Sequence, residues 1–227
     1  MTLAVTAGKG GVGKSTVAYN LGAELDAVVV DADLGMADLP ARRGPDLHDV
    51  LAGRADALEA VDEGGPVALL PCGRSLAGAR AADVTALAGT LDTVSRHYGE
   101  VVVDCPAGLG SDAGVALLAA EACLLVTRPT EPALAGAVQS RELARVLGTP
   151  LARVVLNRAG EAATRPVADA LGAPVTTVPE SDALARAQRA GQPVGAVAPD
   201  SRAASQFRAL ADSVGPLLDR HSSRSSV

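Results

Sequence analysis

A nine-residue glycine-rich stretch near the start of the chain, Gly8–Thr16, constrains the fold more than any other feature. It reads Gly-Lys-Gly-Gly-Val-Gly-Lys-Ser-Thr and matches the pattern G-x-x-x-x-G-K-[ST], in which backbone N–H groups surround phosphate oxygens. In that pattern the lysine, here Lys14, reaches the β and γ phosphates, and the hydroxyl of Ser15 binds Mg²⁺. An apolar run precedes the stretch and a helical pattern follows it. The stretch therefore predicts a strand, a phosphate-binding loop and a helix whose positive N-terminal end faces the anion.

Both lysines of the chain, Lys9 and Lys14, lie in this stretch, and the rest of its 20 Lys and Arg residues are arginines. A lysine directly after the first glycine is not part of the general pattern. With it, the segment from Lys9 to Ser15 resembles the deviant Walker A motif of the MinD/ParA family of P-loop ATPases. The resemblance implies that Lys9 of one subunit contacts phosphates held by a second subunit, in a dimer that sandwiches the nucleotides. The alternative interpretation is that Lys9 is a solvated loop cation.

Apolar runs alternate with helical patterns along the whole chain, which is typical of βαβ units and a parallel sheet. We expect strands at 2–7, 27–31, 67–70, 100–104, 122–127, 151–156 and 174–178. We expect helices at 15–25, 46–52, 83–97, 111–120, 133–147, 181–190 and 203–219. These patterns and the resemblance predict an α/β fold: a single P-loop NTPase domain over residues 1–220, with a mostly parallel sheet of about seven strands and helices on both faces. Residues 221–227, rich in serine, are expected to be a disordered tail.

Carboxylates follow two of the expected strands. Asp104 ends the run Val101–Val103, at the edge of the sheet where the phosphate loop lies, and such an Asp holds Mg²⁺. Asp31 and Asp33 end the second strand, and their i, i+2 spacing places both on one side of an extended segment. The alternatives are an Asp that caps a strand and a plain acidic turn.

The resemblance assigns roles to these residues. The stretch from Asp104 to Gly108 is similar to the Walker B and switch II segment of the family, which implies that the backbone of Gly108 senses the γ phosphate. The stretch that begins at Asp31 is similar to switch I. It implies that Asp33 positions the attacking water and that Asp31, with Ser15 and Asp104, supports Mg²⁺.

Asn157 and Arg158 follow another expected strand and resemble the family's Asn-Arg pair at the adenine pocket. An Asn amide offers the donor and acceptor that match the N6 and N7 atoms of adenine. Pro179 and Glu180 would close the same pocket, and simple capping of a strand is the alternative. The expected catalytic residues are thus Lys9, Lys14 and Asp33, and the expected metal residues are Ser15, Asp31 and Asp104. The expected nucleotide-binding residues are Gly8, Lys9, Gly10, Gly11, Val12, Gly13, Lys14, Ser15, Thr16, Gly108, Asn157, Arg158, Pro179 and Glu180.

The resemblance implies an ATPase that uses ATP and Mg²⁺, forms a homodimer on ATP binding, turns over slowly and is stimulated by a partner protein. Its motifs look closest to MinD, which indicates a role in spatial positioning or regulation of cell division. The chain has no signal peptide pattern and no apolar run long enough for a membrane span, so we expect it in the cytoplasm or peripherally at the inner face of the cell membrane. Near its end, the segment from Pro216 to Arg224 lacks the basic amphipathic pattern of a membrane anchor.

Besides a non-enzymatic scaffold that binds ATP without cleaving it, two other functions stay open. The first is a ParA-like partitioning ATPase that binds DNA nonspecifically through the C-terminal half, where residues 114–227 hold 12 of the Lys and Arg side chains and 10 of the Asp and Glu side chains. The net charge of -6 and the pI of about 5.1 do not favour it. The second is a metal-cluster carrier. The three cysteines are far apart and form no C-x-x-C pair, which argues against it.

Overall fold

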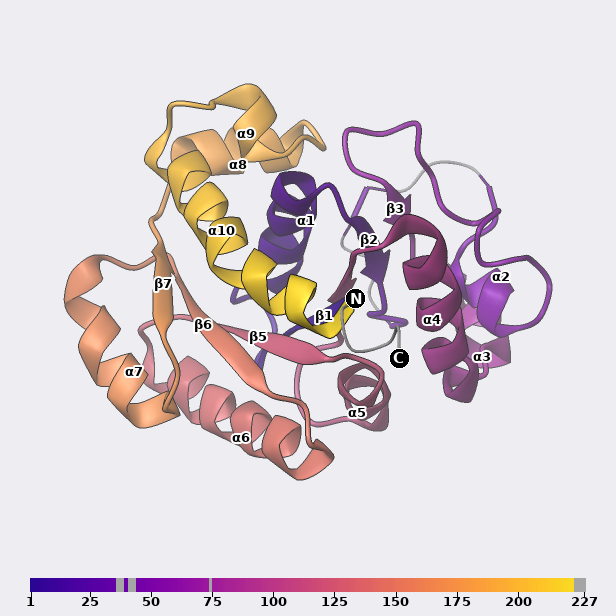
Figure 1. The fold of residues 1–227 in the computed structure, drawn as a ribbon, viewed down its shortest axis with the longest axis horizontal. Helices are drawn as coiled ribbons and strands as arrows, with labels where there is room; N and C mark the ends of the chain where they lie inside the picture. Colours follow the sequence, from indigo (N-terminus) through magenta and orange to yellow (C-terminus); the bar gives the residue numbers. More distant parts are fainter. Residues whose placement is uncertain (36–38, 41–43, 74, 223–227) are drawn as a thin grey trace.

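The computed structural model describes residues 1–35, 39–40, 44–73 and 75–222 of the chain. Within these residues a seven-stranded sheet has the order β3-β2-β4-β1-β5-β6-β7, and all of its paired strands are parallel (Figure 1). The strands are β1 Thr2–Thr6, β2 Val28–Asp31, β3 Leu69–Leu70, β4 Val101–Asp104, β5 Ala122–Thr127, β6 Leu151–Asn157 and β7 Val175–Val178. The predicted α/β class and the seven strands are confirmed. The sheet is entirely parallel in the described residues, where the sequence predicted a mostly parallel one.

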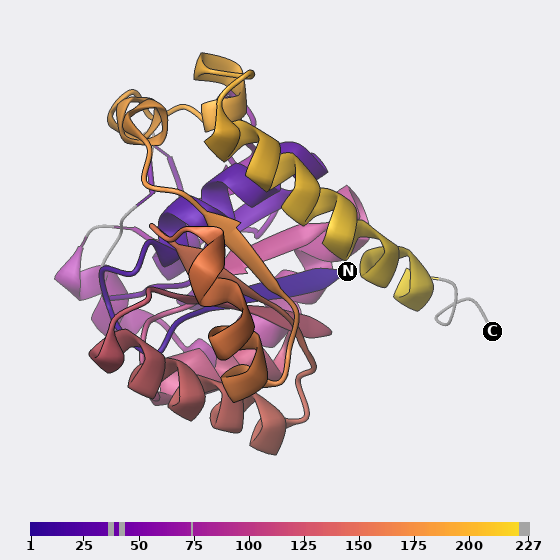
Figure 2. The same cartoon turned by 90° about the vertical axis from the view of Figure 1, so that its left-hand side faces the viewer.

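Helices cover both faces of this sheet, as Figures 1 and 2 show. The first face packs against the helices α1 Lys14–Leu25, α8 Asp182–Arg189, α9 Val194–Val197 and α10 Arg202–Ser222. The second face packs against α2 Leu47–Leu51, α4 Leu87–Tyr98, α5 Ser111–Leu118, α6 Glu131–Leu147 and α7 Thr164–Leu171. A further short helix, α3 Leu76–Ala81, lies beside α2, and short 3₁₀ turns precede α4 and α7.

The core is built from Ala, Val and Leu, with Phe207 of α10 as its one phenylalanine. Successive strand residues point to opposite faces, so Leu3 and Val5 belong to one core cluster and Ala4 to the other. Each face therefore needs a layer of helices, which explains why the strands read as continuous apolar runs. All three cysteines are buried and free of disulfide bonds.

Some elements differ from the sequence expectations. Three short helices were not predicted: α3, α7 and α9. Each has eight residues or fewer, which gives the 3.6-residue apolar period little length in which to show. The predicted helix over 83–97 splits into a 3₁₀ turn at Val84–Ala86 and α4, and the last helix continues to Ser222. Residues 223–227 of the predicted tail lie outside the described residues. No helix in the described part of the chain is long and apolar enough to cross a membrane.

The strand order places the loops after β1, β2 and β4 at one edge of the sheet. Strand β1 lies between β4 and β5, and β4 lies between β1 and β2. The register pairs Asp31 with Asp104 and Asp104 with Val5. After β1 the chain continues through α1, on one face of the sheet, to β2. After β4 it continues through α5, on the other face, to β5. In open parallel sheets, ligands bind at such a crossing point, beyond the carboxyl ends of the strands.

Candidate functional site

The glycine-rich loop connects β1 to α1 at this crossing point. Gly11 and Gly13 have φ angles of 76° and 99°, in the left-handed region that side chains with a Cβ disfavour. Gly13 is the N-cap of α1, and its carbonyl accepts the first helical hydrogen bond, from the Val17 N–H. The local sequence thus lets the backbone bend tightly and direct a helix N-terminus at the loop's concave side. Such an end attracts anions because its first N–H groups have no partner within the helix.

Two contacts with distant residues also fix the shape of the loop. A Cβ on Gly8 would lie 1.9 Å from the carbonyl oxygen of Gly136 in α6, so the two backbones pack directly against each other. A Cβ on Gly13 would lie 2.1 Å from Nδ2 of Asn157 at the end of β6. The same Nδ2 donates a hydrogen bond of 2.8 Å to the Val12 carbonyl. The loop is therefore held from both sides by parts of the chain more than a hundred residues away.

Lys14 lies at the centre of the site. Its Nζ donates to Oδ1 of Asp104 at 2.6 Å and lies 3.8 Å from Oδ2 of Asp33. Lys14 is buried, which disfavours its charge, but the neighbouring Asp104 carboxylate outweighs burial and raises the pKa of Lys14. The ammonium is therefore charged at neutral pH, next to the place where a phosphate would enter.

Asp31 and Asp104 lie side by side on β2 and β4 and are 1% and 0% exposed. Burial, followed by the charge of Asp104, raises the pKa of Asp31 to about 7. The buried Oδ2 of Asp104 has no hydrogen-bond partner among the described residues. This buried carboxylate oxygen, on an Asp104 side chain that also interacts with the Ser15 hydroxyl, fits Mg²⁺, which binds one or two carboxylates plus substrate phosphates. The described residues contain no group of three His, Cys, Asp or Glu side chains that could hold a metal by themselves.

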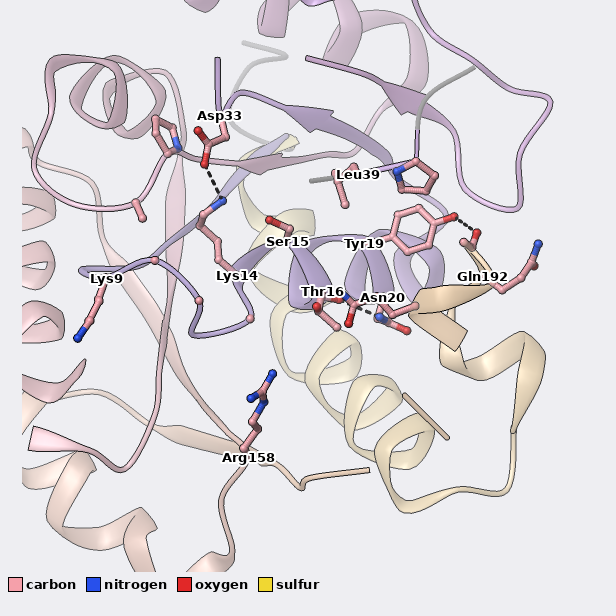
Figure 3. Close-up of a pocket in the computed structure, with 18 residues that line it drawn as sticks. Lys9, Lys14, Ser15, Thr16, Tyr19, Asn20, Asp33, Leu39, Arg158 and Gln192 are labelled. Atoms are coloured by element: carbon pink, nitrogen blue, oxygen red, sulfur yellow. Dashed lines mark hydrogen bonds and ion pairs between the residues drawn. The ribbon is translucent and has the colours of Figure 1, made fainter. Parts of the chain in front are cut away.

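A cavity of about 480 Å³ opens above the loop (Figure 3). Of the residues that the sequence predicted, those that line it are Lys9, Gly10, Gly11, Gly13, Lys14, Ser15, Thr16, Asp33 and Arg158. The predicted residues that do not line it are Gly8, Val12, Asp31, Asp104, Gly108, Asn157, Pro179 and Glu180. Asp31 and Asp104 are buried, and Asp104 is joined to the cavity lining through its bond with Lys14. The structure thus gathers the phosphate-loop, switch and Arg158 residues around one space.

Asn157 and Gly108 have partners within the protein. Oδ1 of Asn157 accepts a hydrogen bond from the Arg158 N–H at 3.0 Å, so its amide joins Arg158 to the loop at Val12. The Gly108 N–H donates to the Ala7 carbonyl at 2.8 Å. Contact of Asn157, Pro179 and Glu180 with adenine, and of the Gly108 backbone with the γ phosphate, stays a prediction.

The cavity has a second group of lining residues that the sequence reading missed: Tyr19, Asn20, Leu39, Pro40, Pro106, Ala107, Gln188, Gly191 and Gln192. Tyr19 and Asn20 lie one helical turn beyond Ser15 and Thr16, so helical spacing was a signal that could have found them. The Tyr19 hydroxyl donates to the Gly191 carbonyl at 2.8 Å, and Oδ1 of Asn20 accepts from the Val194 N–H at 2.7 Å. These bonds join α1 to the turn after α8 and to the first residue of α9, a pairing over more than 170 residues that no local pattern indicates.

Lys9 and Lys14 both line the cavity, but they differ in exposure and direction. Lys9 is exposed, and Figure 3 shows its side chain pointing away from Lys14 at the rim of the cavity. The structure describes no ion pair for it with another described residue. The chain therefore presents one lysine inside the site and a second one outward beside it.

Comparisons with known proteins agree with this geometry. Residues 3–194 match the family described as the CobQ/CobB/MinD/ParA nucleotide binding domain. An uncharacterised ATP-binding protein of Methanocaldococcus jannaschii is 31% identical over 227 residues, spanning 93% of this chain and 86% of that protein. The septum site-determining protein MinD of Pyrococcus horikoshii, solved with Mg-ADP, superimposes with a TM-score of 0.88 at 30% identity, over 96% of this chain and 97% of that one. The cell division ATPase MinD of Pyrococcus furiosus gives a TM-score of 0.87 at 30% identity, over 95% and 98%.

Proposed function

Because the chain belongs to the CobQ/CobB/MinD/ParA family of nucleotide-binding P-loop proteins, we propose that it is an ATP-hydrolysing, MinD-like molecular switch. One observation carries the proposal. The buried Lys14 ammonium lies between the carboxylates of Asp104 and Asp33 at the N-terminus of α1, on the floor of a cavity large enough for a nucleotide. This arrangement supplies a phosphate cradle, a cation for the transferred group and a carboxylate for the attacking water.

The binding roles follow from the chemistry of each group. The N–H groups of the loop and the ammonium of Lys14 hold the phosphates, and on binding Lys14 turns from Asp104 toward them. Ser15 and Asp104, with Asp31 behind them, offer the oxygen donors that would hold Mg²⁺. When bound, the ion neutralises charge on the phosphates.

Hydrolysis then depends mainly on positioning and electrostatics. Asp33 reaches the cavity from the end of β2 and orients a water molecule toward the terminal phosphorus. Lys14, once turned toward the phosphates, stabilises the charge that builds on the transferred group. Lys9 adds a second cation from a partner subunit, so ATP binding favours a homodimer and hydrolysis releases it. A stimulating partner protein would act on the same switch.

Hydrolysis by the wild type and by Asp33→Ala tests the proposal. We expect the wild type to release phosphate from ATP in the presence of Mg²⁺, and the variant to lose roughly 100-fold or more in rate, as for loss of a positioned acid or base. ATP affinity, measured separately by calorimetry, should change little because Asp33 does not form the phosphate cradle. Equal rates for the two proteins would contradict the role of Asp33, and no turnover by the wild type, alone or at high concentration, would contradict an ATPase.

The similarity to MinD structures supports a role in spatial positioning at the cytoplasmic side of a membrane, and two binding assays separate this from partitioning. ATP-dependent sedimentation of the protein with anionic vesicles would support a membrane role, and no such sedimentation would remove it. Retardation of DNA at low salt, lost steeply as salt rises, would instead favour the ParA-like alternative. The buried positions of Cys72, Cys105 and Cys123 give no support to the cluster-carrier alternative.

A further inference from the structure

Two buried side chains that do not line the cavity bind the backbone of Asp33 and Leu34. The Cys72 thiol donates to the Asp33 carbonyl with a sulfur-to-oxygen distance of 3.1 Å. Nε2 of His48 lies 3.1 Å from the Leu34 carbonyl oxygen. A carbonyl oxygen only accepts hydrogen bonds, so Nε2 must carry the proton and donate it. Two consecutive carbonyl groups of this segment therefore each have a side-chain donor.

The local structure fixes the positions of both donors. His48 lies in α2, which is tied to the segment after β3 by bonds from the Leu47 and His48 N–H groups to the carbonyls of Pro71 and Cys72. The two donors touch each other, with Cys72 Sγ 3.6 Å from His48 Nε2. Gly78 of α3 closes the far side of the imidazole, because a Cβ there would lie 2.9 Å from Nδ1. His48 is 3% exposed and Cys72 is fully buried, so both donors are shielded from water.

Neither residue can touch a bound nucleotide directly, because neither lines the cavity. Their effect reaches the site through Asp33. The Asp33 N–H donates to Oδ1 of Asp31 at 3.3 Å, and its carboxylate faces Lys14 at 3.8 Å. The peptide groups on both sides of the Asp33 Cα thus have fixed partners, which leaves its side chain directed into the cavity.

We propose that His48 and Cys72 are positioning residues for ATP hydrolysis, which fix the backbone of Asp33 and Leu34 so that the Asp33 carboxylate faces the terminal phosphate. The inference rests on the proposed function, in which Asp33 orients the attacking water. Displacement of a reacting group by about 1 Å can cost on the order of 100-fold in rate. The pair is suited to this task because both donors are buried, and the His48 bond lies wholly inside the protein.

Matched variants separate the hydrogen bond from simple packing. His48→Gln keeps an N–H donor at about the place of Nε2, whereas His48→Leu fills the space without a donor. We expect His48→Leu to lower kcat roughly 10- to 100-fold with KM for ATP within about twofold, since the phosphate cradle is untouched. His48→Gln should restore most of the lost kcat. Equal kcat for His48→Leu and the wild type, or equal losses in both variants, would overturn the proposal.

Cys72→Ser and Cys72→Ala form a second pair, in which serine keeps a donor and alanine removes it with little change in volume. This pair tests the proposal even if His48→Leu fails to fold. Thermal unfolding of each variant shows whether it is folded. We expect the alanine variant to lose kcat with KM preserved and the serine variant to retain more of it. A loss that follows the unfolding temperature rather than the donor would overturn the proposal. Asp33→Ala is assayed beside these variants to separate the role of Asp33 from that of His48 and Cys72. If Asp33→Ala hydrolyses ATP like the wild type, the proposed role of Asp33 itself is contradicted.

Discussion

At the scale of single residues, the site concentrates negative charge around one buried cation. Asp31, Asp33 and Asp104 surround Lys14, and three of these four side chains are almost inaccessible to water. Burial of a charge is costly unless the charge is paired. The Asp104 carboxylate is therefore stabilised by the Lys14 ammonium, and the pKa of Asp31 is raised. A site with such an excess of carboxylate oxygens is arranged for a cation.

The two lysines should therefore contribute very differently to stability. Lys14→Met removes the partner of a buried carboxylate and should lower the free energy of unfolding by about 3 kcal/mol. Lys9→Met is the matched control, because it removes an exposed ammonium and should change that free energy by less than about 0.5 kcal/mol. Urea denaturation of the nucleotide-free proteins measures both. Similar effects of the two substitutions would show that the pair of Lys14 and Asp104 does not stabilise the fold.

The pKa of Asp31 predicts how stability depends on pH. Burial raises this pKa from 3.8 to about 7. At pH values between these two, the Asp31 carboxyl is therefore protonated in the folded protein and ionised in the unfolded chain. The free energy of unfolding should then fall as pH rises through this window. Asp31→Asn keeps an oxygen for the Asp33 N–H but cannot titrate. Between pH 5 and pH 8, without metal, the wild type should lose roughly 2.5 kcal/mol more than this variant. An equal loss in both proteins would contradict the assignment.

At the scale of elements, the phosphate loop depends on helix α6, which lies on the opposite face of the sheet from α1. Gly8 and Gly136 pack backbone to backbone because neither has a side chain. The pattern G-x-x-x-x-G-K-[ST] explains the glycine at position 8 by the loop alone, but it contains no information about Gly136. That contact exists only once α6 is folded onto β5 and β6.

Gly136→Ala should therefore weaken nucleotide binding although it lies in the middle of a helix. Its Cβ would be 2.9 Å from the Gly8 carbonyl oxygen, so α6 or the loop must shift. We expect a loss of affinity for ATP of roughly 10-fold, measured by calorimetry, since the loop's N–H groups are displaced together. Gly89→Ala in α4 is the control. A Cβ there meets nothing within 4 Å, so helix propensity predicts equal or slightly higher stability and unchanged binding. Normal affinity in Gly136→Ala would refute the coupling.

At the scale of the whole molecule, the outward direction of Lys9 matters for assembly (Figure 3). An exposed ammonium at the rim of the phosphate site can reach a second molecule that faces it. In a twofold dimer each Lys9 would then serve the partner's nucleotide. Lys14 cannot play this part, because it is enclosed within its own subunit.

Mixing two inactive variants tests this assembly. We expect Lys9→Ala and Asp33→Ala to hydrolyse ATP poorly alone. In a mixed dimer, the Lys9→Ala subunit keeps its own Asp33 and receives an intact Lys9 from its partner. Random exchange in an equal mixture should thus restore roughly a quarter of the wild-type sites. If Lys9 acts within its own subunit, no site is complete and the mixture stays inactive.

Local sequence patterns were sufficient to predict those parts of the site whose residues lie within a short segment of the chain. The glycine-rich loop, the strand that ends in Asp104 and the Asp31 and Asp33 pair could be read from the sequence, because each is a short segment whose backbone conformation its own residues favour. Short helices such as α7, and the far wall of the cavity at Gln188 and Gln192, could not. Their positions depend on packing between distant segments.

The sequence by itself determined that the chain folds as an α/β protein with a phosphate loop, since apolar runs and glycine positions encode strands and turns locally. The tertiary structure decided how the site is supported. It places Asn157 against Val12, Gly136 against Gly8, and His48 with Cys72 behind Asp33. These contacts join residues 14 to 145 positions apart. Close packing and hydrogen bonding at such separations arise only when the sheet brings the segments together, so no local pattern carries them.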